Sequence, residues 1–264
     1  MESTVSESPH ALRREKAQAY FAEPALFAAF EEQYLRIPRL MYLETALAML
    51  PQPPRRVLDV GCGTGHSLAY LSERLPDAEI VGIDPELGMI AIARERAGQN
   101  VELLVCRAED VPAEVGQFDL VLVYSNFRLW TDPEAGLRGI VAHISQGGLG
   151  YLLDLRGDLD PALRAELLAE METQEMRAFL ASQLDAAHSV LTLEELARSS
   201  GAEVELRVGG LAGWPPRSTN AIRLLERNEQ LAELVFGVGD AGFRSPRAID
   251  SVVHLFLGGR ERVD

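Results

Sequence analysis

The sequence of 264 residues has little cysteine and no long hydrophobic run, and both shortages narrow the kind of protein it encodes. Its two cysteines, Cys62 and Cys106, form no CxxC pair, so we expect neither a disulfide framework nor a metal site. No apolar run approaches the roughly 18 residues of a membrane span. The first residues have no apolar stretch after their charges, which is unlike a secretory signal. We therefore expect a cytoplasmic protein without a membrane partner.

Positive charge is also scarce. Lys and Arg number 25 against 40 Asp and Glu, which gives a formal net charge of -15 at pH 7. Nucleic-acid binding draws on contacts between cationic side chains and phosphates, and an acidic surface opposes them. The longest basic cluster, Arg13-Arg14-Glu15-Lys16, is short and interrupted. Nucleic acid is therefore a disfavoured partner.

Short apolar runs alternate with segments of helical period from about residue 55 onward. This alternation is typical of an α/β fold, in which helices cover a mostly parallel sheet. The seven runs are RVLDV (56–60), EIVGID (79–84), VELLVC (101–106), FDLVLVY (118–124), GYLLDL (150–155), VELRV (204–208) and SVVHLFL (251–257). The first five are almost continuously hydrophobic, as strands buried on both faces must be. The sequence therefore predicts a sheet of seven strands.

Helix start signals lie between these runs. Asp132 and Asp160 are each followed by proline, which predicts an N-cap with Pro at the first helical position. Thr192 with Glu195 predicts a capping box.

Three further segments do not belong to the minimal alternation. Residues 1–50 are predicted to form an N-terminal helical cap, whose aromatic residues either pack in a core or cover a substrate pocket. Residues 51–264 are predicted to form the main domain, with helical inserts near 158–190 and 215–243.

The stretch VLDVGCGTGHS (57–67) carries most of the functional information. A buried strand is followed by Gly61, Gly63 and Gly65 at alternate positions and then by an amphipathic helix. Glycines allow a sharp turn and a close backbone approach to a ligand, and the helix N-terminus offers free amides. Asp59, inside the buried strand, is expected either to fix the loop by hydrogen bonds or to meet a cationic group.

The second strand ends in Asp84. A carboxylate at that edge, beside the glycine turn of the neighbouring strand, can accept both ribose hydroxyls of a nucleoside. Dinucleotide sites share this spacing, but they show GxGxxG, whereas this chain reads GxGxG.

The combination DxGxGxG plus an acidic strand end resembles class I S-adenosylmethionine (SAM)-dependent methyltransferases of the small-molecule branch, such as those of ubiquinone and menaquinone biosynthesis. The resemblance covers roughly residues 50–210. It implies a three-layer, Rossmann-like sheet of order 3-2-1-4-5-7-6 with an antiparallel seventh strand and a helical cap. It also implies SAM as cofactor, S-adenosyl-L-homocysteine (SAH) as product, and methyl transfer to an O, N or C nucleophile of a small molecule, by a monomer or homodimer.

In that family the glycine loop holds the methionine part of SAM, the acid holds the ribose, and the following segments flank the adenine. The resemblance implies these cofactor-binding residues: Asp59, Gly61, Cys62, Gly63, Gly65, His66, Asp84, Pro85, Met89, Ala108, Glu109, Tyr124 and Ser125. Two positions depart from the family pattern: Arg107 replaces a common aspartate, and Arg128 to Trp130 replace common histidines.

No catalytic residue is assigned from the sequence, because methyl transfer from a sulfonium needs mainly alignment and exclusion of water. The candidates at the expected C-terminal edge of the sheet are Asn126, Arg128, Asp154 and His188. Arg128 suits either an anionic substrate group or a surface ion pair, and His188 either the substrate side or the protein surface.

Other functions stay open at this point. The same motifs serve SAM-using enzymes that do not transfer methyl, such as cyclases and aminocarboxypropyl transferases, and also RNA methyltransferases. The turn YSNF after the fourth strand is unlike the NPPY or DPPY turn of many nucleic-acid enzymes, and the acidic charge agrees with that. An NAD-dependent oxidoreductase and a non-catalytic subunit of the same fold are the remaining alternatives.

Overall fold

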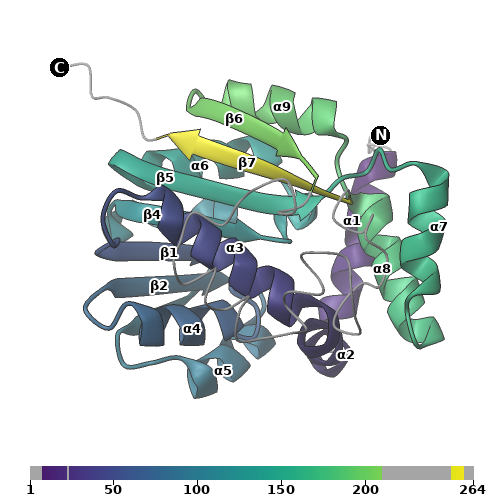
Figure 1. Cartoon of the computed structure of the whole chain (residues 1–264), viewed down its shortest axis with the longest axis horizontal. Helices are drawn as coiled ribbons and strands as arrows, with labels where there is room; N and C mark the ends of the chain where they lie inside the picture. The colour runs from purple at the N-terminus through teal and green to yellow at the C-terminus, as the bar shows by residue number, and fades with distance from the viewer. Residues whose placement is uncertain (1–7, 23, 210–250, 259–264) are drawn as a thin grey trace, which may run out of the picture.

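The computed structural model describes residues 8–22, 24–209 and 251–258, and a seven-stranded sheet runs through the middle of this part (Figure 1). The strands are β1 (Arg56–Val60), β2 (Glu79–Asp84), β3 (Val101–Val105), β4 (Phe118–Tyr124), β5 (Ile144–Leu155), β6 (Glu203–Val208) and β7 (Val252–Gly258). Their order is β3-β2-β1-β4-β5-β7-β6, with β1 to β5 parallel and β7 antiparallel to both β5 and β6. The predicted order and the predicted direction of the seventh strand are confirmed.

The register of the parallel strands places three residues of the candidate site at the same edge of the sheet. Val60 pairs with Ile83 on one side and with Val123 on the other. Because these strands are parallel, their carboxyl ends meet at one edge of the sheet. The residue that follows each of the three, namely Gly61, Asp84 and Tyr124, therefore stands at the same edge.

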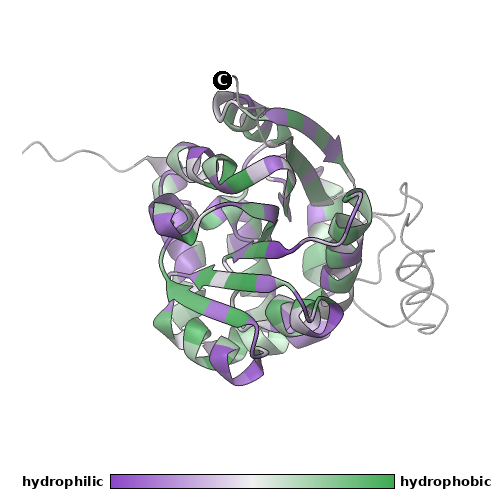
Figure 2. Cartoon of the chain, turned by 90° about the vertical axis from the view of Figure 1, so that its left-hand side faces the viewer, coloured by the Kyte–Doolittle hydropathy of each residue, from purple (hydrophilic) through white to green (hydrophobic). Residues whose placement is uncertain are grey.

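Successive residues of a strand face opposite sides of the sheet, and each side packs on its own helices. Val57, Leu120 and Leu122 share a buried cluster with residues of α3 (Arg36–Met49), α4 (His66–Arg74) and α5 (Leu87–Arg96). Their neighbours, among them Leu58 and Val121, pack on α6 (Pro133–His143) and α9 (Val190–Ser199). The result is the predicted three-layer arrangement, and Figure 2 shows hydrophobic residues along the strands between helices of mixed character.

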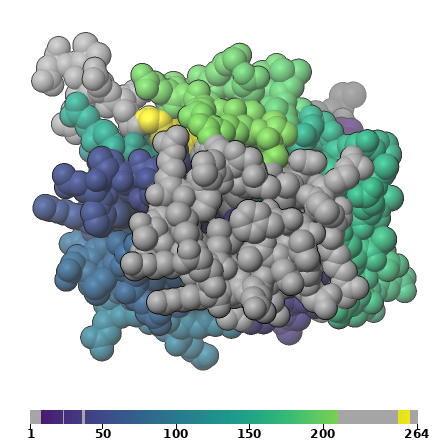
Figure 3. All heavy atoms as spheres, in the orientation of Figure 1, coloured from purple at the N-terminus to yellow at the C-terminus, as the bar shows by residue number. Residues whose placement is uncertain are grey.

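A further group of helices lies at the end of the sheet where the parallel strands finish (Figure 1). It comprises α1 (Pro9–Gln18), α2 (Pro24–Phe30), a π-helical turn (Glu31–Leu35), α7 (Pro161–Ala169) and α8 (Gln174–Ala186). The core shared by α2, the π turn, α7 and α8 contains Phe30, Leu163, Phe179 and Leu180, and α1 packs on α8. In the space-filling view of Figure 3, α7 and α8 lie on the right, apart from α4 and α5 at the lower left. We call α1, α2, the π turn, α7 and α8 the helical cap.

The cap therefore joins segments that are far apart in the sequence. The N-terminal residues and the predicted insert 158–190 both contribute helices to it. The last helix before residue 50, α3, packs instead on the sheet through Tyr42, Leu43 and Ala46. The predicted insert 215–243 lies outside the described residues.

The helix starts follow two of the three predicted signals. Asp132 accepts a hydrogen bond from the Ala135 amide and Asp160 from the Ala162 amide, at 2.9 and 2.7 Å. The prediction that Thr192 starts a helix was wrong. The N-cap is Ser189, three residues earlier, because its hydroxyl accepts from the Thr192 amide at 3.1 Å, and helix α9 therefore begins at Val190.

No helix among the described residues is long and apolar enough to cross a membrane.

Candidate active site

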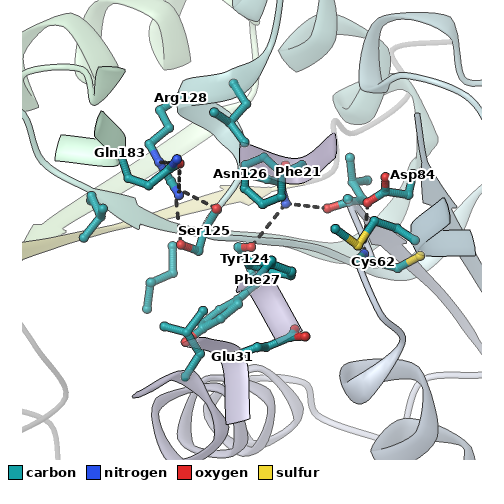
Figure 4. A pocket seen from close by; sticks show the side chains of 18 of the residues that line it. Phe21, Phe27, Glu31, Cys62, Asp84, Tyr124, Ser125, Asn126, Arg128 and Gln183 are labelled. Carbon is teal, nitrogen blue, oxygen red and sulfur yellow. Dashed lines mark hydrogen bonds between the residues drawn. The ribbon is translucent and has the colours of Figure 1, made fainter. Parts of the chain in front are cut away.

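A cavity of about 340 Å³ lies between the edge of the sheet and the helical cap (Figure 4). Residues from the ends of β1, β2 and β4 line one half, and residues of α2 and α8 line the other. The predicted cofactor-binding residues that line it are Asp59, Gly61, Cys62, Gly63, Asp84, Pro85, Met89, Ala108, Glu109, Tyr124 and Ser125. Gly65 and His66 do not line it. The motifs identified in the sequence thus converge on one cavity.

The glycine loop after β1 has a conformation that only glycine adopts easily. Gly61, Gly63 and Gly65 have φ of +69°, +56° and +83°. At Gly61 a Cβ would lie 2.5 Å from the Asn126 amide nitrogen, and at Gly65 it would lie 2.8 Å from the Ala93 Cα. Gly63 has more room, with the nearest atom at 3.5 Å. Gly61 and Gly65 therefore have no room for a side chain, whereas Gly63, in the middle of the loop, faces the cavity.

Asp84 connects the end of β2 to this loop. Its carboxylate accepts hydrogen bonds from the Gly63 amide at 3.0 Å and from the Glu86 amide at 2.9 Å. Burial raises the pKa of Asp84 to about 6, although both hydrogen bonds oppose the rise. The group is therefore mainly ionised at pH 7, and it faces the cavity as a hydrogen-bond acceptor.

Asp59 is a buried acid in the wall of the cavity. Its side chain is 1% exposed, and its Oδ2 has no hydrogen-bond partner among the described residues. Burial raises the pKa of Asp59 to about 7, with Asp84 and Glu31 adding to the rise and Arg39 opposing it. A buried carboxylate oxygen without a partner is costly, and a cationic ligand group would remove that cost.

An ion pair between the π turn of the cap and α3 was missed by the sequence analysis. Arg39 contacts Glu31, and the Thr64 hydroxyl of the glycine loop donates to the same carboxylate. The Arg39 guanidinium lies 5.3 Å from the centre of the Tyr124 ring, and His66 Nε2 lies 3.8 Å from Glu31. One signal was present in the sequence, because Glu31 follows Phe27 by four residues and so shares a helix face with an aromatic residue of the cap.

Asn126, a catalytic candidate, holds the loop after β4 against β1. Its amide nitrogen donates to the carbonyl oxygens of Val60 at 2.8 Å and Tyr124 at 3.2 Å, and its oxygen accepts from the Trp130 indole at 2.9 Å. Figure 4 shows this side chain between Tyr124 and the glycine loop. Both ends of the amide are therefore occupied by contacts within the protein.

Arg128 and Asp154 form a buried pair, so the alternative of a surface ion pair is wrong. Arg128 is 4% exposed and Asp154 1%. The guanidinium contacts the Asp154 carboxylate and donates to the Gln183 side-chain oxygen of α8 at 2.9 and 3.1 Å. Arg128 lines the cavity, whereas Asp154 lies behind it.

His188, the last catalytic candidate, lies away from the cavity lining. It is buried rather than exposed, because its ring stacks on His10 of α1 at a centroid distance of 4.4 Å and also contacts Phe127. Burial lowers the pKa of His188 to about 4, so its ring is neutral at pH 7. Its position supports the contact between α1 and the body of the protein.

Glu109 lines the cavity, but its carboxylate is already engaged within the protein. Its oxygen accepts hydrogen bonds from the amides of Thr131 and Asp132, at 2.7 and 2.9 Å, just before α6. Arg107 donates to the Thr131 hydroxyl at 2.9 Å. The predicted reading of an adenine edge by Ala108 and Glu109 stays a prediction.

The half of the cavity beyond the β4 loop is lined largely by aromatic rings. Phe21, Phe27 and Phe30 surround Phe179 of α8 with ring centroids 4.8 to 6.3 Å away. His254 of β7, which the sequence analysis also missed, lines the cavity as well. Its Nδ1 lies 2.6 Å from the Tyr151 hydroxyl, and burial lowers its pKa to about 4.

Strand order, a left-handed glycine loop after β1 and an acid at the end of β2 are the features that the resemblance to class I methyltransferases implied. Residues 57–148 match a family model described as a methyltransferase domain. The plantazolicin methyltransferase BpumL, crystallised with SAH, superimposes with a TM-score of 0.73 over 95% of this chain and 96% of that chain, at 21% sequence identity.

Two curated relatives show the extent of the sequence likeness. Demethylmenaquinone methyltransferase of Thermus thermophilus is 38% identical over 108 residues, which are 40% of this chain and 49% of that protein. Trans-aconitate 2-methyltransferase of an Acidovorax species is 28% identical over 189 residues, 70% of each chain. The chain spans about half the length of several curated relatives it matches. The resemblance seen in the glycine loop and Asp84 is confirmed.

No group of three or more His, Cys, Asp or Glu residues suited to a metal ion occurs within residues 8–22, 24–209 and 251–258.

Proposed function

We propose that this protein transfers the methyl group of SAM to a small-molecule acceptor and releases SAH. One observation carries the proposal: a single cavity joins a nucleoside-type cradle, made by Gly63 and Asp84, to an apolar chamber under the helical cap. The methyltransferase domain match over 57–148 supports the same activity.

The residues present fit SAM, whose polar groups differ along its length. Asp84 would accept the ribose hydroxyls, with Pro85 and Met89 beside the adenine. The methionine part would lie along the open middle of the glycine loop, and Asp59, whose Oδ2 has no hydrogen-bond partner among the described residues, would receive its ammonium group. Arg39 is the cation on that side of the cavity and suits the methionine carboxylate.

Bound SAM supplies an activated methyl group, so the protein has to align the acceptor and exclude water. The cap encloses the acceptor side with Phe21, Phe27 and Phe179. His254 is the histidine that lines the cavity among the described residues, and it is neutral at pH 7. Because its pKa is low it is a weak base, which favours an acceptor that loses its proton readily.

A small-molecule acceptor fits this cavity better than a nucleic acid does. The acceptor half is covered by helices and lined by apolar rings, and the chain carries a net charge of -15. The relatives support the same class, since their names include demethylmenaquinone, trans-aconitate and malonyl-carrier-protein methyltransferases.

Thermal unfolding with SAM, SAH or NAD tests the cofactor class before any acceptor is known. A ligand that binds the folded state raises the midpoint by mass action. SAM and SAH should both raise it in a concentration-dependent manner, and NAD should not. A rise with NAD alone, or with none of the three, would contradict the proposal.

The transferred group needs a second assay. Incubation with SAM labelled in its methyl group and a panel of phenols, amines and carboxylic acids should yield a labelled product heavier by one CH₂. A product that carries the aminocarboxypropyl group instead would show that the protein transfers that part of SAM and not the methyl group.

A further inference from the structure

Ser125 has an unusual backbone conformation at the centre of the cavity wall. Among the described residues it is the one non-glycine residue with positive φ, at +59°. It follows β4, and its amide still donates to the Leu153 carbonyl of β5 at 2.7 Å. A side chain is strained in this left-handed region because its Cβ approaches the backbone carbonyl. Such strain persists where surrounding contacts hold it.

Arg128 supplies those contacts. Its Nη1 donates to the Ser125 carbonyl at 2.7 Å and approaches the Ser125 hydroxyl at 3.3 Å. The Arg128 amide donates to Asp154 Oδ2 at 2.8 Å, and its guanidinium contacts the same carboxylate. Figure 4 shows the Arg128 side chain over the Ser125 turn. One arginine therefore closes the turn and fastens it to the end of β5.

The same guanidinium is held from the cap. Gln183 of α8 accepts hydrogen bonds from Arg128 through its oxygen and donates to the Ala17 carbonyl of α1 through its nitrogen, at 3.1 Å. Gln183 is 1% exposed. A buried ion pair is weak evidence for stability by itself, but a chain of satisfied buried hydrogen bonds fixes geometry. The turn is thus linked through two side chains to both cap segments.

We propose that Arg128 is a positioning residue that keeps Ser125 in its left-handed conformation. Gln183 of α8 holds the Arg128 guanidinium, so this conformation of Ser125 depends on the contact between the cap and the rest of the protein. The consequence reaches the glycine loop, because Asn126, the next residue of the turn, contacts Val60 and would collide with any Cβ at Gly61. If Ser125 leaves this conformation, Asn126 moves away from Val60, and the loop after β4 is no longer held against the glycine loop. The inference stands on these contacts and does not require the proposed methyl transfer.

Arg128→Lys is the first variant, because an ammonium group has its donors on one nitrogen and lacks the planar fork with which Arg128 reaches Ser125, Asp154 and Gln183 at the same time. The indole of Trp130 reports on the turn, since it donates to the Asn126 oxygen at 2.9 Å. The chain has two tryptophans, so ¹⁵N-tryptophan labelling gives two indole signals, and Trp214→Phe assigns them. We expect Arg128→Lys to shift or broaden the Trp130 signal and to weaken SAH binding about tenfold.

A second substitution separates positioning from a general loss of structure. Glycine adopts positive φ without strain, so a glycine at position 125 does not need Arg128 to hold its conformation. In a protein that already carries Ser125→Gly, Arg128→Lys should therefore change the Trp130 signal little and SAH affinity less than threefold. Ser125→Ala is the matched control. It removes the hydroxyl but keeps the Cβ, so the full effect of Arg128→Lys should remain in that background.

Gln183→Met gives the milder test if Arg128→Lys does not fold. It removes one acceptor of the guanidinium and should move the Trp130 signal in the same direction by less, again relieved by Ser125→Gly. An unchanged Trp130 signal in Arg128→Lys, or equal relief by Ser125→Ala and Ser125→Gly, would overturn the proposal. Absence of SAH binding in the unsubstituted protein would contradict the proposed function alone, because the indole signal still tests Arg128.

Discussion

The two halves of the cavity are built in different ways. The half at the glycine loop uses backbone amides and acids that follow directly from strands β1 and β2, so its shape depends on local sequence. The half under the cap is assembled from α1, α2 and α8, which come together only in the folded chain. A short sequence motif is therefore enough to form the half at the glycine loop, whereas the half under the cap depends on packing between segments that are far apart in the sequence.

Within the glycine loop, two glycines should respond very differently to the same change. Gly65→Ala should lower the free energy of unfolding by about 3 kcal/mol, because strain at positive φ adds to a Cβ placed 2.8 Å from the Ala93 backbone. Gly63→Ala should cost about 1–2 kcal/mol, since it meets φ strain without a close contact. Urea unfolding of the two variants measures the difference, and equal losses would show that α5 does not constrain the loop.

Asp84→Ala should weaken SAH binding by about 2 kcal/mol, or roughly thirtyfold, because the ribose loses charge-assisted hydrogen bonds. Titration calorimetry with SAH measures it. Asp110→Ala removes an exposed acid of the neighbouring 3-10 turn and serves as the matched control, with affinity within twofold. An Asp84→Ala variant that binds SAH like the unsubstituted protein would mean that the ribose lies elsewhere.

The pH dependence of SAH binding tests the role of Asp59. Burial raises its pKa to about 7 in the folded protein, against about 4 in the unfolded chain, so the folded state holds the extra proton. Its contribution to stability therefore falls as pH rises from about 4 to 7. An ammonium group favours the ionised form, so SAH should bind roughly five- to tenfold more tightly at pH 7.5 than at pH 6.

Asp59→Asn is the control for that titration. It removes the proton whose release accompanies binding, so the affinity of the variant should change only about twofold between pH 6 and 7.5, the part that Asp84 contributes. Asp84, with its pKa raised to about 6, adds a steeper dependence below pH 6. The same slope in Asp59→Asn as in the unsubstituted protein would assign the titration to another group.

The smallest effect on the cofactor is expected from the cap core. Phe179→Leu leaves a gap among Phe21, Phe27 and Phe30 and should lower the free energy of unfolding by about 1 kcal/mol. SAH affinity should stay within threefold, because this ring lines the acceptor half. A tenfold loss of SAH affinity, measured beside the unfolding curve, would show that the two halves are not separate.

The fold was predictable because its signals are local. The seven apolar runs of the sequence form the seven strands, and Gly61, Gly63 and Asp84 lie together at the edge of the sheet, where they line the cavity. Glu31 and Arg39 escaped prediction because no motif marks them, and they reach the glycine loop only when the π turn and α3 pack there. Ser125 was expected at the site, but its left-handed backbone depends on Arg128 and Gln183, 55 residues apart in the sequence.

A crystal structure of the protein grown with SAH tests the central claim most directly. We expect the ribose hydroxyls within hydrogen-bonding distance of Asp84, and the methionine part beside Gly63 with its ammonium group facing Asp59. Electron density for SAH at another place on the protein, with this cavity occupied only by water, would contradict it.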